Sequence, residues 1–227
     1  MPSKRLIVVP MKDPNKCKSR LSHNLSSELR RELALKLFKQ SIRKLKAAIT
    51  RIEKRIDLAV VTESVEIQDI CKKDNITTIQ SDKIGLSLSY YLNAAAQWAI
   101  EKGYHSMGVV PSDIANPKIK DLVSLLKYPI SNKEIVICPS KDLGTNALIV
   151  CPPNALLFSF GKKSFLKHLR LAKQIRLNSV VLPLESIRLD VDVGEDLAAL
   201  PIKYRPFPFF GSSAGSKTSI NCLDPIF

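Results

Sequence analysis

Short runs of consecutive apolar residues recur along this chain, each bounded by polar or turn-forming residues. The first, residues 6–9, ends at Pro10, and further runs lie at residues 56–61, 107–110, 135–138 and 147–151. Continuous apolar runs of this length are typical of strands buried in a parallel sheet. We predict a strand at each run, and less regular strands at residues 77–79, 180–182 and 188–193.

Segments with helical periodicity separate these runs. Between residues 26 and 48, apolar residues about 3.6 positions apart predict an amphipathic helix with a basic outer face: Leu29, Leu33, Leu37, Ile42 and Leu45. Further helices are predicted at residues 67–73, 86–100, 119–126 and 164–176. Because strands and helices alternate, the predicted fold class is α/β, with a mostly parallel sheet that becomes mixed in the second half and has helices on both faces.

The chain has the length of one domain. Its 227 residues can bury a core without disulfides or a structural metal. We assign residues 1–200 to this domain. Residues 201–227 are rich in Pro, Gly and Ser, which favours a poorly ordered tail, although the aromatic residues there could instead cover a neighbouring surface.

Composition excludes several classes of protein. The chain is 45% hydrophobic and 25% charged, without an apolar run long enough to span a membrane and without a signal-peptide pattern. The five cysteines are scattered and include no Cys-x-x-Cys pair. We therefore expect a cytoplasmic protein with reduced thiols and no membrane partner.

The net charge of +14 is concentrated in one segment. Residues 1–57 contain 16 basic and 5 acidic residues. This excess could mark a nucleic-acid surface, a site for small polyphosphates, or the solvated face of a basic helix. Since neither a zinc-finger spacing nor aromatic residues interleaved with the basic run accompany it, we expect no nucleic-acid partner.

Three aspartates occupy positions suited to a metal site. Asp113 follows the strand at residues 107–110, at the edge where open α/β sheets bind ligands. Asp190 and Asp192 are two residues apart in an extended run, so both carboxylates are predicted to point to one face. Two or three converging carboxylates can hold Mg²⁺, but each residue is also compatible with a turn, a helix cap or a solvent-facing strand.

Two further kinds of segment could bind phosphate. The loop after the first strand contains Lys12, Lys16, Lys18 and Arg20, but no glycine, so it is not a P-loop or a dinucleotide fingerprint. A solvated basic loop is the simpler interpretation of this segment. The Gly144-Thr145-Asn146 turn and the Gly161-to-Ser164 segment offer backbone N–H groups and hydroxyls, while Ser164 could equally be a helix cap. His168 is expected to pack or cap rather than catalyse.

Taken in order, these segments resemble a known family. The matching motifs are Val9-Pro10-Met11-Lys12, Lys18-Ser19-Arg20-Leu21, Pro111-Ser112-Asp113, Gly144-Thr145-Asn146-Ala147-Leu148, Phe160-Gly161 with Ser164-Phe165 and His168, and Leu189-Asp190-Val191-Asp192 with Glu195-Asp196-Leu197. From residue 6 to about residue 200 the chain is similar to the 2-phospho-L-lactate guanylyltransferase (CofC-type) family, which includes phosphoenolpyruvate-using members.

The resemblance implies a single Rossmann-like nucleotidyltransferase domain of the glycosyltransferase-A type. Such an enzyme joins GTP to a small phosphorylated three-carbon acid and releases pyrophosphate, in deazaflavin coenzyme F-420 biosynthesis. It further implies GTP and a phospho-acid as partners, Mg²⁺ as cofactor, and a possible homodimer.

The resemblance also implies roles for residues of this chain. By matching position, Asp113, Asp190 and Asp192 coordinate Mg²⁺, and Thr145, Asn146, Gly161 and Ser164 bind the acid substrate. Lys12, Lys18 and Arg20 face the triphosphate and act with Asp113 in catalysis, while Pro10 and Gly85 complete the nucleotide site.

One departure affects base selection. The family has Gly-Leu-Asn where this chain has Gly85-Leu86-Ser87, so an amide that could read the base is missing. The acceptor is also open, because phospholactate, phosphoenolpyruvate and phosphoglycerate share a phosphate and a carboxylate. The alternatives are another nucleotidyltransferase of this fold, acting on molybdopterin or a sugar phosphate, and a basic nucleic-acid-binding protein.

Overall fold

The computed structural model describes residues 4–53, 55–80 and 85–205. A seven-stranded sheet in the order β3-β2-β1-β4-β6-β5-β7 forms its centre. The strands are β1 (Arg5–Pro10), β2 (Ile56–Val61), β3 (Thr77–Ile79), β4 (Ser106–Val109), β5 (Glu134–Pro139), β6 (Thr145–Cys151) and β7 (Asn178–Val181). Only β6 runs antiparallel to its neighbours, β4 and β5, so the predicted mixed, mostly parallel sheet is confirmed.

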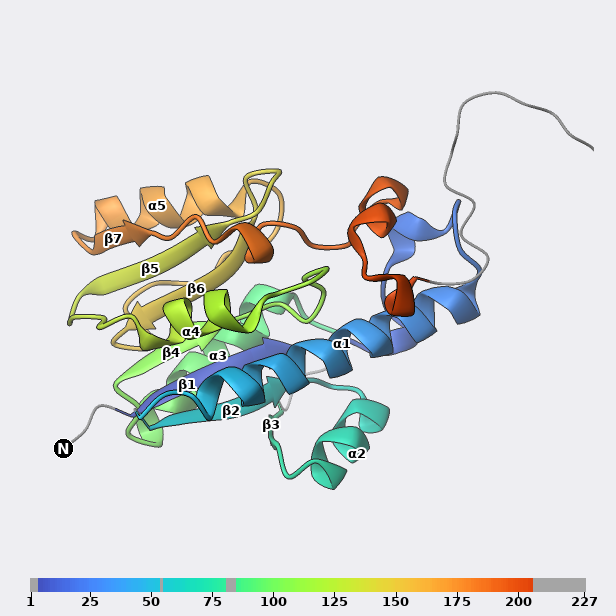
Figure 1. Cartoon of the computed structure of the whole chain (residues 1–227). Coiled ribbons are helices and arrows are strands. Elements are labelled where there is room, and N and C mark those ends of the chain that lie inside the picture. The colour runs from blue at the N-terminus through green and yellow to red at the C-terminus, as the bar shows by residue number, and fades with distance from the viewer. Residues whose placement is uncertain (1–3, 54, 81–84, 206–227) are drawn as a thin grey trace, which may run out of the picture.

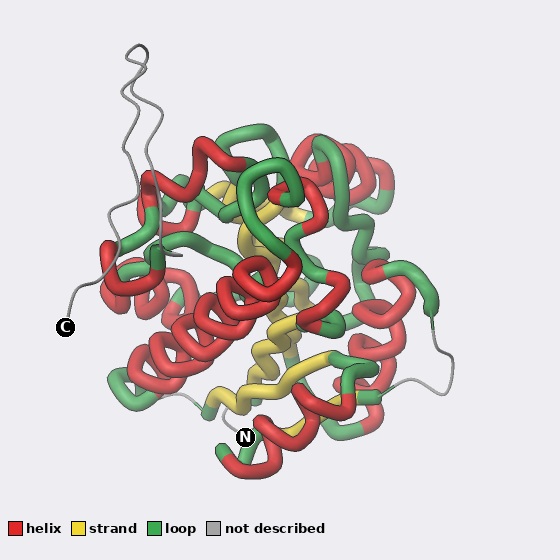
Figure 2. The backbone as a smooth tube through the Cα atoms, turned by 90° about the vertical axis from the view of Figure 1, so that its right-hand side faces the viewer, coloured by secondary structure: helices red, strands yellow, loops and turns green. Residues whose placement is uncertain are grey.

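Helices cover both faces of the sheet, as predicted (Figure 1). They are α1 (Ser27–Ile49), α2 (Val65–Lys73), α3 (Leu88–Glu101), α4 (Ile119–Lys127) and α5 (Ser164–Gln174). The core between α1, α2, α4 and one sheet face is separate from the core between α3, α5 and the other face. Figure 2, turned by 90°, shows the strands in the middle with helices on either side.

The long helix α1 carries two apolar stripes. Ser26 caps its start by accepting a hydrogen bond from the Leu29 N–H, 3.3 Å away. One stripe, which includes Phe38, packs on the sheet. The other, which includes Leu33 and Leu37, packs against loop residues instead. The second stripe therefore anchors these loops to α1.

This loop packing is a third apolar cluster. It brings the loop after β1 against the segment of residues 191–200. The two segments lie side by side in Figure 1, in blue and red. Its buried members are Leu21, Leu25, Leu33, Leu37, Ala115, Val191, Leu197 and Leu200. Burying about eight such side chains holds both loops in place without strand pairing.

One predicted strand is wrong. Residues 188–193 form no strand but an extended loop with a single antiparallel bridge between Ile114 and Asp190. It follows a short 3₁₀ turn, η3 (Glu185–Ile187). The alternating Asp-Val-Asp pattern therefore reflects packing of Val191 into the loop cluster rather than a place in the sheet.

The segment of residues 194–204 packs onto the domain. The turns η4 (Gly194–Ala199) and η5 (Ile202–Tyr204) follow the loop, and the Tyr204 hydroxyl accepts a hydrogen bond from Arg43 of α1 at 3.0 Å. The predicted tail otherwise lies outside the described residues. In the described ranges, every helix is too short or too polar to cross a membrane, and the four cysteines are free thiols.

Candidate active site

A pocket of about 310 Å³ opens at the carboxyl ends of β1, β2 and β4. The loop of residues 11–20 forms one wall, and residues 61–63 with the start of α3 form another. The turn of residues 111–113 and Asp192 lie between them. The pocket has the position in which open α/β sheets bind ligands, and its volume lies within the range of small-molecule sites.

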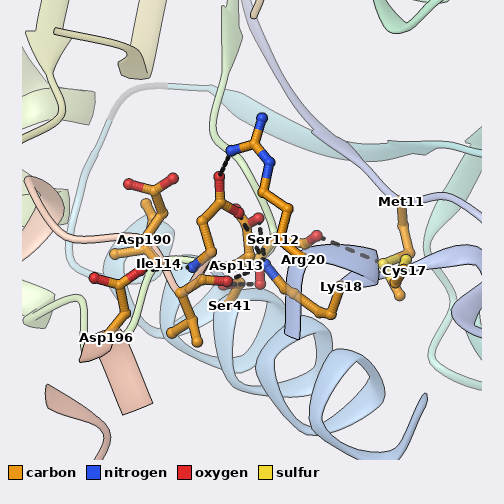
Figure 3. A network of polar contacts seen from close by, with 12 residues as sticks. Met11, Cys17, Lys18, Arg20, Ser41, Ser112, Asp113, Ile114, Asp190 and Asp196 are labelled. Carbon is orange, nitrogen blue, oxygen red and sulfur yellow. Dashed lines mark hydrogen bonds and ion pairs between the residues drawn. The ribbon is translucent and has the colours of Figure 1, made fainter. Parts of the chain in front are cut away.

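The ammonium of Lys18 lies at the centre of the polar network (Figure 3). Its Nζ is 2.7 Å from Asp113 Oδ2, 2.6 Å from the carbonyl oxygen of Val191 and 3.7 Å from Asp192 Oδ1. Burial favours the neutral amine, but the nearby carboxylates outweigh it and raise the pKa of Lys18. Lys18 is therefore a buried, permanently charged cation among oxygen atoms.

The backbone at Lys18 is strained. Its φ of 55° is in the left-handed region, which costs a residue with a β-carbon of the order of 1 kcal/mol. The two short hydrogen bonds from Nζ hold it there. Figure 3 shows Lys18 reaching toward Asp113 from the loop after β1. Arg20 is exposed and donates to Asp192 Oδ2 at 3.1 Å.

Two backbone contacts position Asp113. The Ser41 hydroxyl of α1 donates to the Ser112 carbonyl at 3.1 Å, and the Val191 N–H donates to the Asp113 carbonyl at 3.0 Å. The Ile114–Asp190 bridge continues this pairing. The turn after β4 and the loop of residues 188–193 are thus joined, which brings the three predicted aspartates to one place.

The carboxyl group of Asp190 has a raised pKa. Burial, reinforced by repulsion from Asp113 and Asp192, raises its pKa to about 6. Its Oδ1 accepts a hydrogen bond from the Asn146 amide at 3.1 Å, and the same amide donates to the Ile187 carbonyl at 2.8 Å. Asn146, predicted to bind substrate, is buried and holds Asp190 in position.

The donor set fits a hard divalent cation. Carboxylate and carbonyl oxygens are the ligands that Mg²⁺ takes, and the carboxylates of Asp113 and Asp192 add to the effect of burial in raising the pKa of Asp190. The three carboxylates do not surround a common point. In the described ranges, no group of three His, Cys, Asp or Glu side chains is arranged to hold a metal ion. The Lys18 ammonium lies among them instead.

A second polar cluster lies at the junction of β6 and α5. Thr145, Ser164 and His168 are all buried. The His168 Nε2 accepts a hydrogen bond from the Ser159 backbone N–H at 3.0 Å, so its Nδ1 must carry the proton and donate to the Thr145 hydroxyl at 3.1 Å. Burial lowers the pKa of His168 to about 4, which keeps this imidazole neutral.

The tautomer of His168 sets the polarity of the hydroxyls. The Ser164 hydroxyl lies 3.0 Å from that of Thr145. Since Thr145 accepts from His168, one of the two hydroxyl hydrogens is left to donate outward, whichever way the pair is oriented. Such a pair suits an anion. Gly161, with φ of 130°, lies three residues before Ser164, and its carbonyl accepts from the Ser164 N–H at 3.1 Å.

The predicted site residues fall into two groups. Pro10, Lys12, Lys18, Arg20, Asp113 and Asp192 line the pocket, while Thr145, Gly161 and Ser164 gather at the start of α5. Asn146 links the two groups by donating to Asp190, and the Gly85 N–H donates to the Glu63 carboxylate at the pocket wall at 3.0 Å. Glu63 and Tyr91 also line the pocket and were missed, because nothing in the sequence marks a lone acid after β2 as functional.

The fold is shared with solved structures of nucleotidyltransferases. A solved structure described as a candidate nucleotide-diphospho-sugar transferase, from Desulfovibrio desulfuricans G20, superposes with a TM-score of 0.64 at 19% identity, covering 91% of this chain and 90% of its own. At that identity the likeness shows the fold alone.

The family follows from the sequence match. The model described as "Guanylyl transferase CofC like" matches residues 5–204, so the chain belongs to this family. It is 34% identical over 200 residues to the 3-phospho-D-glycerate guanylyltransferase of Colwellia psychrerythraea, covering 88% of this chain and 92% of that protein. It is 30% identical to the 2-phospho-L-lactate guanylyltransferase of Methanocaldococcus jannaschii, covering 87% and 82%.

Proposed function

We propose that this protein is a guanylyltransferase that joins GTP to a small phosphorylated three-carbon acid and releases pyrophosphate, as in the biosynthesis of coenzyme F-420. Relatives named for 3-phospho-D-glycerate, 2-phospho-L-lactate and phosphoenolpyruvate support this substrate class. The observation that carries the proposal is the pair of adjoining sites. A cationic pocket ends at Asp113, and an anion cradle at Thr145 and Ser164 is linked to it through Asn146 and Asp190.

The chemistry needs positioning rather than a protein nucleophile. The acceptor phosphate is already ionised, so one of its oxygens can attack the α-phosphorus of GTP without a general base. The bond from this oxygen to the α-phosphorus forms as the bond to the β-phosphate oxygen breaks, and pyrophosphate leaves. Holding both substrates in line lowers the barrier by restricting their motion.

Each group of residues has a part in this reaction. One hydroxyl of the Thr145–Ser164 pair donates to the acceptor phosphate. The cationic groups of Lys12, Lys18 and Arg20 neutralise the triphosphate and the departing pyrophosphate. We assign the Mg²⁺ ligands to Asp113, Asp190 and Asp192; a bound ion there would neutralise charge on the phosphates of both substrates.

The contacts made by the basic residues of α1 favour this proposal over nucleic-acid binding. Several cations on the outer face of α1 are engaged within the protein. Lys36 pairs with Glu32 at 2.7 Å, Lys44 donates to Asn116 at 2.9 Å, and Lys46 donates to the Asp74 carbonyl at 2.8 Å. These cations are paired on the surface of the domain rather than arranged as an aromatic-lined binding groove.

Pyrophosphate release with Mg²⁺ tests the proposal. Each of the four ribonucleoside triphosphates is combined with each of the three phospho-acids, and product masses are recorded. We expect a guanylylated acid from GTP with at least one acceptor. Asp113→Asn should lose turnover at least 100-fold, whereas Asp69→Asn on the exposed face of α2 should not. Release of no pyrophosphate in any combination, or equal activity of the two variants, would overturn the proposal.

A further inference from the structure

The departure at Ser87 leaves the selection of the base to another residue. The Ser87 hydroxyl caps α3, accepting from the Tyr90 N–H at 3.2 Å. The Asn93 amide, the next candidate, donates to the Ser89 and Phe158 carbonyls and accepts from the Phe158 N–H. Its hydrogen-bonding groups are therefore engaged in fixing the loop before α5 against α3.

Sheet order indicates where the base of a bound nucleotide lies. The acceptor cradle is on β6 and α5, on one side of the Lys18–Asp113 centre, while β2 lies on the other side, next to β1. A nucleotide whose α-phosphate is at the centre extends its base away from the acceptor. That direction leads to the pocket wall formed by Glu63, Leu88 and Tyr91.

Glu63 is the acid on this wall, and it is held in a defined orientation. Its Oε2 accepts from the Gly85 N–H at 3.0 Å and from the Tyr91 hydroxyl at 2.8 Å. The Tyr91 hydroxyl in turn accepts from the Leu86 N–H at 3.0 Å. The Gly85 N–H, followed by the Tyr91 hydroxyl, lowers the pKa of Glu63, so the side chain is a carboxylate near neutral pH. Its Oε1 accepts no hydrogen bond from the described ranges of the chain.

We propose that Glu63 is the residue that selects guanine, its carboxylate accepting hydrogen bonds from the N1–H and the 2-amino group of the base. This inference rests on the proposed function. Guanine presents two adjacent donors on this edge. Adenine and cytosine present a ring-nitrogen acceptor there, and uracil places carbonyl oxygens on both sides of its N3–H. A carboxylate therefore favours guanine. It disfavours the other bases, because their acceptor atoms would face the carboxylate oxygens without a hydrogen between them.

A change of one atom in Glu63 tests this reading. In Glu63→Gln, the side-chain carbonyl still accepts from N1–H, but the amide NH₂ faces the 2-amino group of guanine. Xanthine has a carbonyl at that position, to which the NH₂ can donate. We expect kcat/KM with GTP to fall about 100-fold and kcat/KM with XTP to rise at least 10-fold, which reverses the preference of the wild-type protein.

Binding and control measurements make the result specific. Calorimetric titration of GTP and XTP should show the same reversal in Kd without turnover. Glu63→Ala should bind GTP and ITP about equally, because ITP lacks only the 2-amino group. Glu66→Gln, which removes the same charge from α2 outside the pocket, should keep the wild-type preference.

The outcomes separate this inference from the proposed function. If the wild-type protein forms a guanylylated acid but Glu63→Gln keeps the wild-type ratio of GTP to XTP, the assignment of Glu63 is wrong and the function stands. If the wild-type protein neither binds nor converts GTP, both are wrong. A reversed preference in Glu63→Gln and an unchanged one in Glu66→Gln support the assignment.

Discussion

Replacing Asp190 with asparagine should make the protein more stable while removing its activity. The carboxylate of Asp190 is largely buried and lies near those of Asp113 and Asp192, so its ionisation is unfavourable in the folded state. Asparagine has the same shape, carries no charge and can still accept from the Asn146 amide through its own side-chain oxygen. The substitution therefore removes repulsion with little change in packing.

The size and pH dependence of this effect follow from the pKa of Asp190. The difference between about 6 in the folded protein and the ordinary 3.8 corresponds to about 3 kcal/mol, which partial solvent screening reduces to about 2 kcal/mol. Between about pH 4 and pH 6 the folded state retains a proton that the unfolded chain has released. The free energy of unfolding of the wild-type protein therefore falls as pH rises through this window, and the penalty is complete above it.

Urea unfolding of both proteins in EDTA, at several pH values from 4.5 to 8, measures this difference. We expect Asp190→Asn to be about 2 kcal/mol more stable at pH 8, with the gap narrowing toward pH 4.5. The matched control is Asp192→Asn, which should not stabilise the protein because Asp192 faces Lys18 at 3.7 Å and Arg20 at 3.1 Å. Mg²⁺ should stabilise the wild-type protein more than Asp190→Asn.

Two results would refute this reasoning. If Asp190→Asn is no more stable than the wild-type protein at pH 8, the crowding of negative charge does not weaken the fold. If the gap is the same at every pH, its cause is not the titration of Asp190. Full activity of the variant would separately remove Asp190 from the mechanism.

Three further changes test other parts of the structure. Ser164→Ala should raise KM for the phospho-acid about 10-fold and KM for GTP less than 2-fold; equal effects in steady-state kinetics would make Ser164 only a structural residue. Lys18→Met removes the ammonium that lies among the carboxylates. Mn²⁺ should then bind the free protein several-fold more tightly, as measured by titrations followed by electron paramagnetic resonance, while turnover falls at least 100-fold. An unchanged Mn²⁺ affinity would contradict competition between the Lys18 ammonium and the metal. Phe38→Ala, in the core beneath α1, should lower the free energy of unfolding by about 3 to 5 kcal/mol in urea titrations, and a loss below about 1 kcal/mol would contradict its packing role.

The α/β architecture could be predicted from the sequence because its signals are local. Runs of buried strand residues and the 3.6-residue spacing in α1 each depend on neighbours within a few turns, and the strands β1, β2 and β4 are found where the pattern predicts them. The position of Asp113 at a strand end follows from the same pattern. Membership of the family could also be predicted from the sequence, because the motifs that carry the resemblance are short and occur in a fixed order.

The pattern failed where packing between distant segments decides the structure. Residues 188–193 alternate like a strand, but Val191 is buried against α1 and the loop after β1, and the segment forms an isolated bridge at Asp190 instead of a strand of the sheet. A period of two cannot distinguish a sheet neighbour from a loop that buries every second residue.

The contacts among the candidate site residues depend on the tertiary structure alone. Sequence identified Lys18, Asp113 and Asp190 as candidates, but not that an ammonium lies among the carboxylates. It also gave no sign that Asn146 donates a hydrogen bond to Asp190, or that Glu63 lines the pocket. The physical reason is that hydrogen bonding, burial and charge repulsion depend on which groups meet in space, and these groups come from segments up to 173 residues apart.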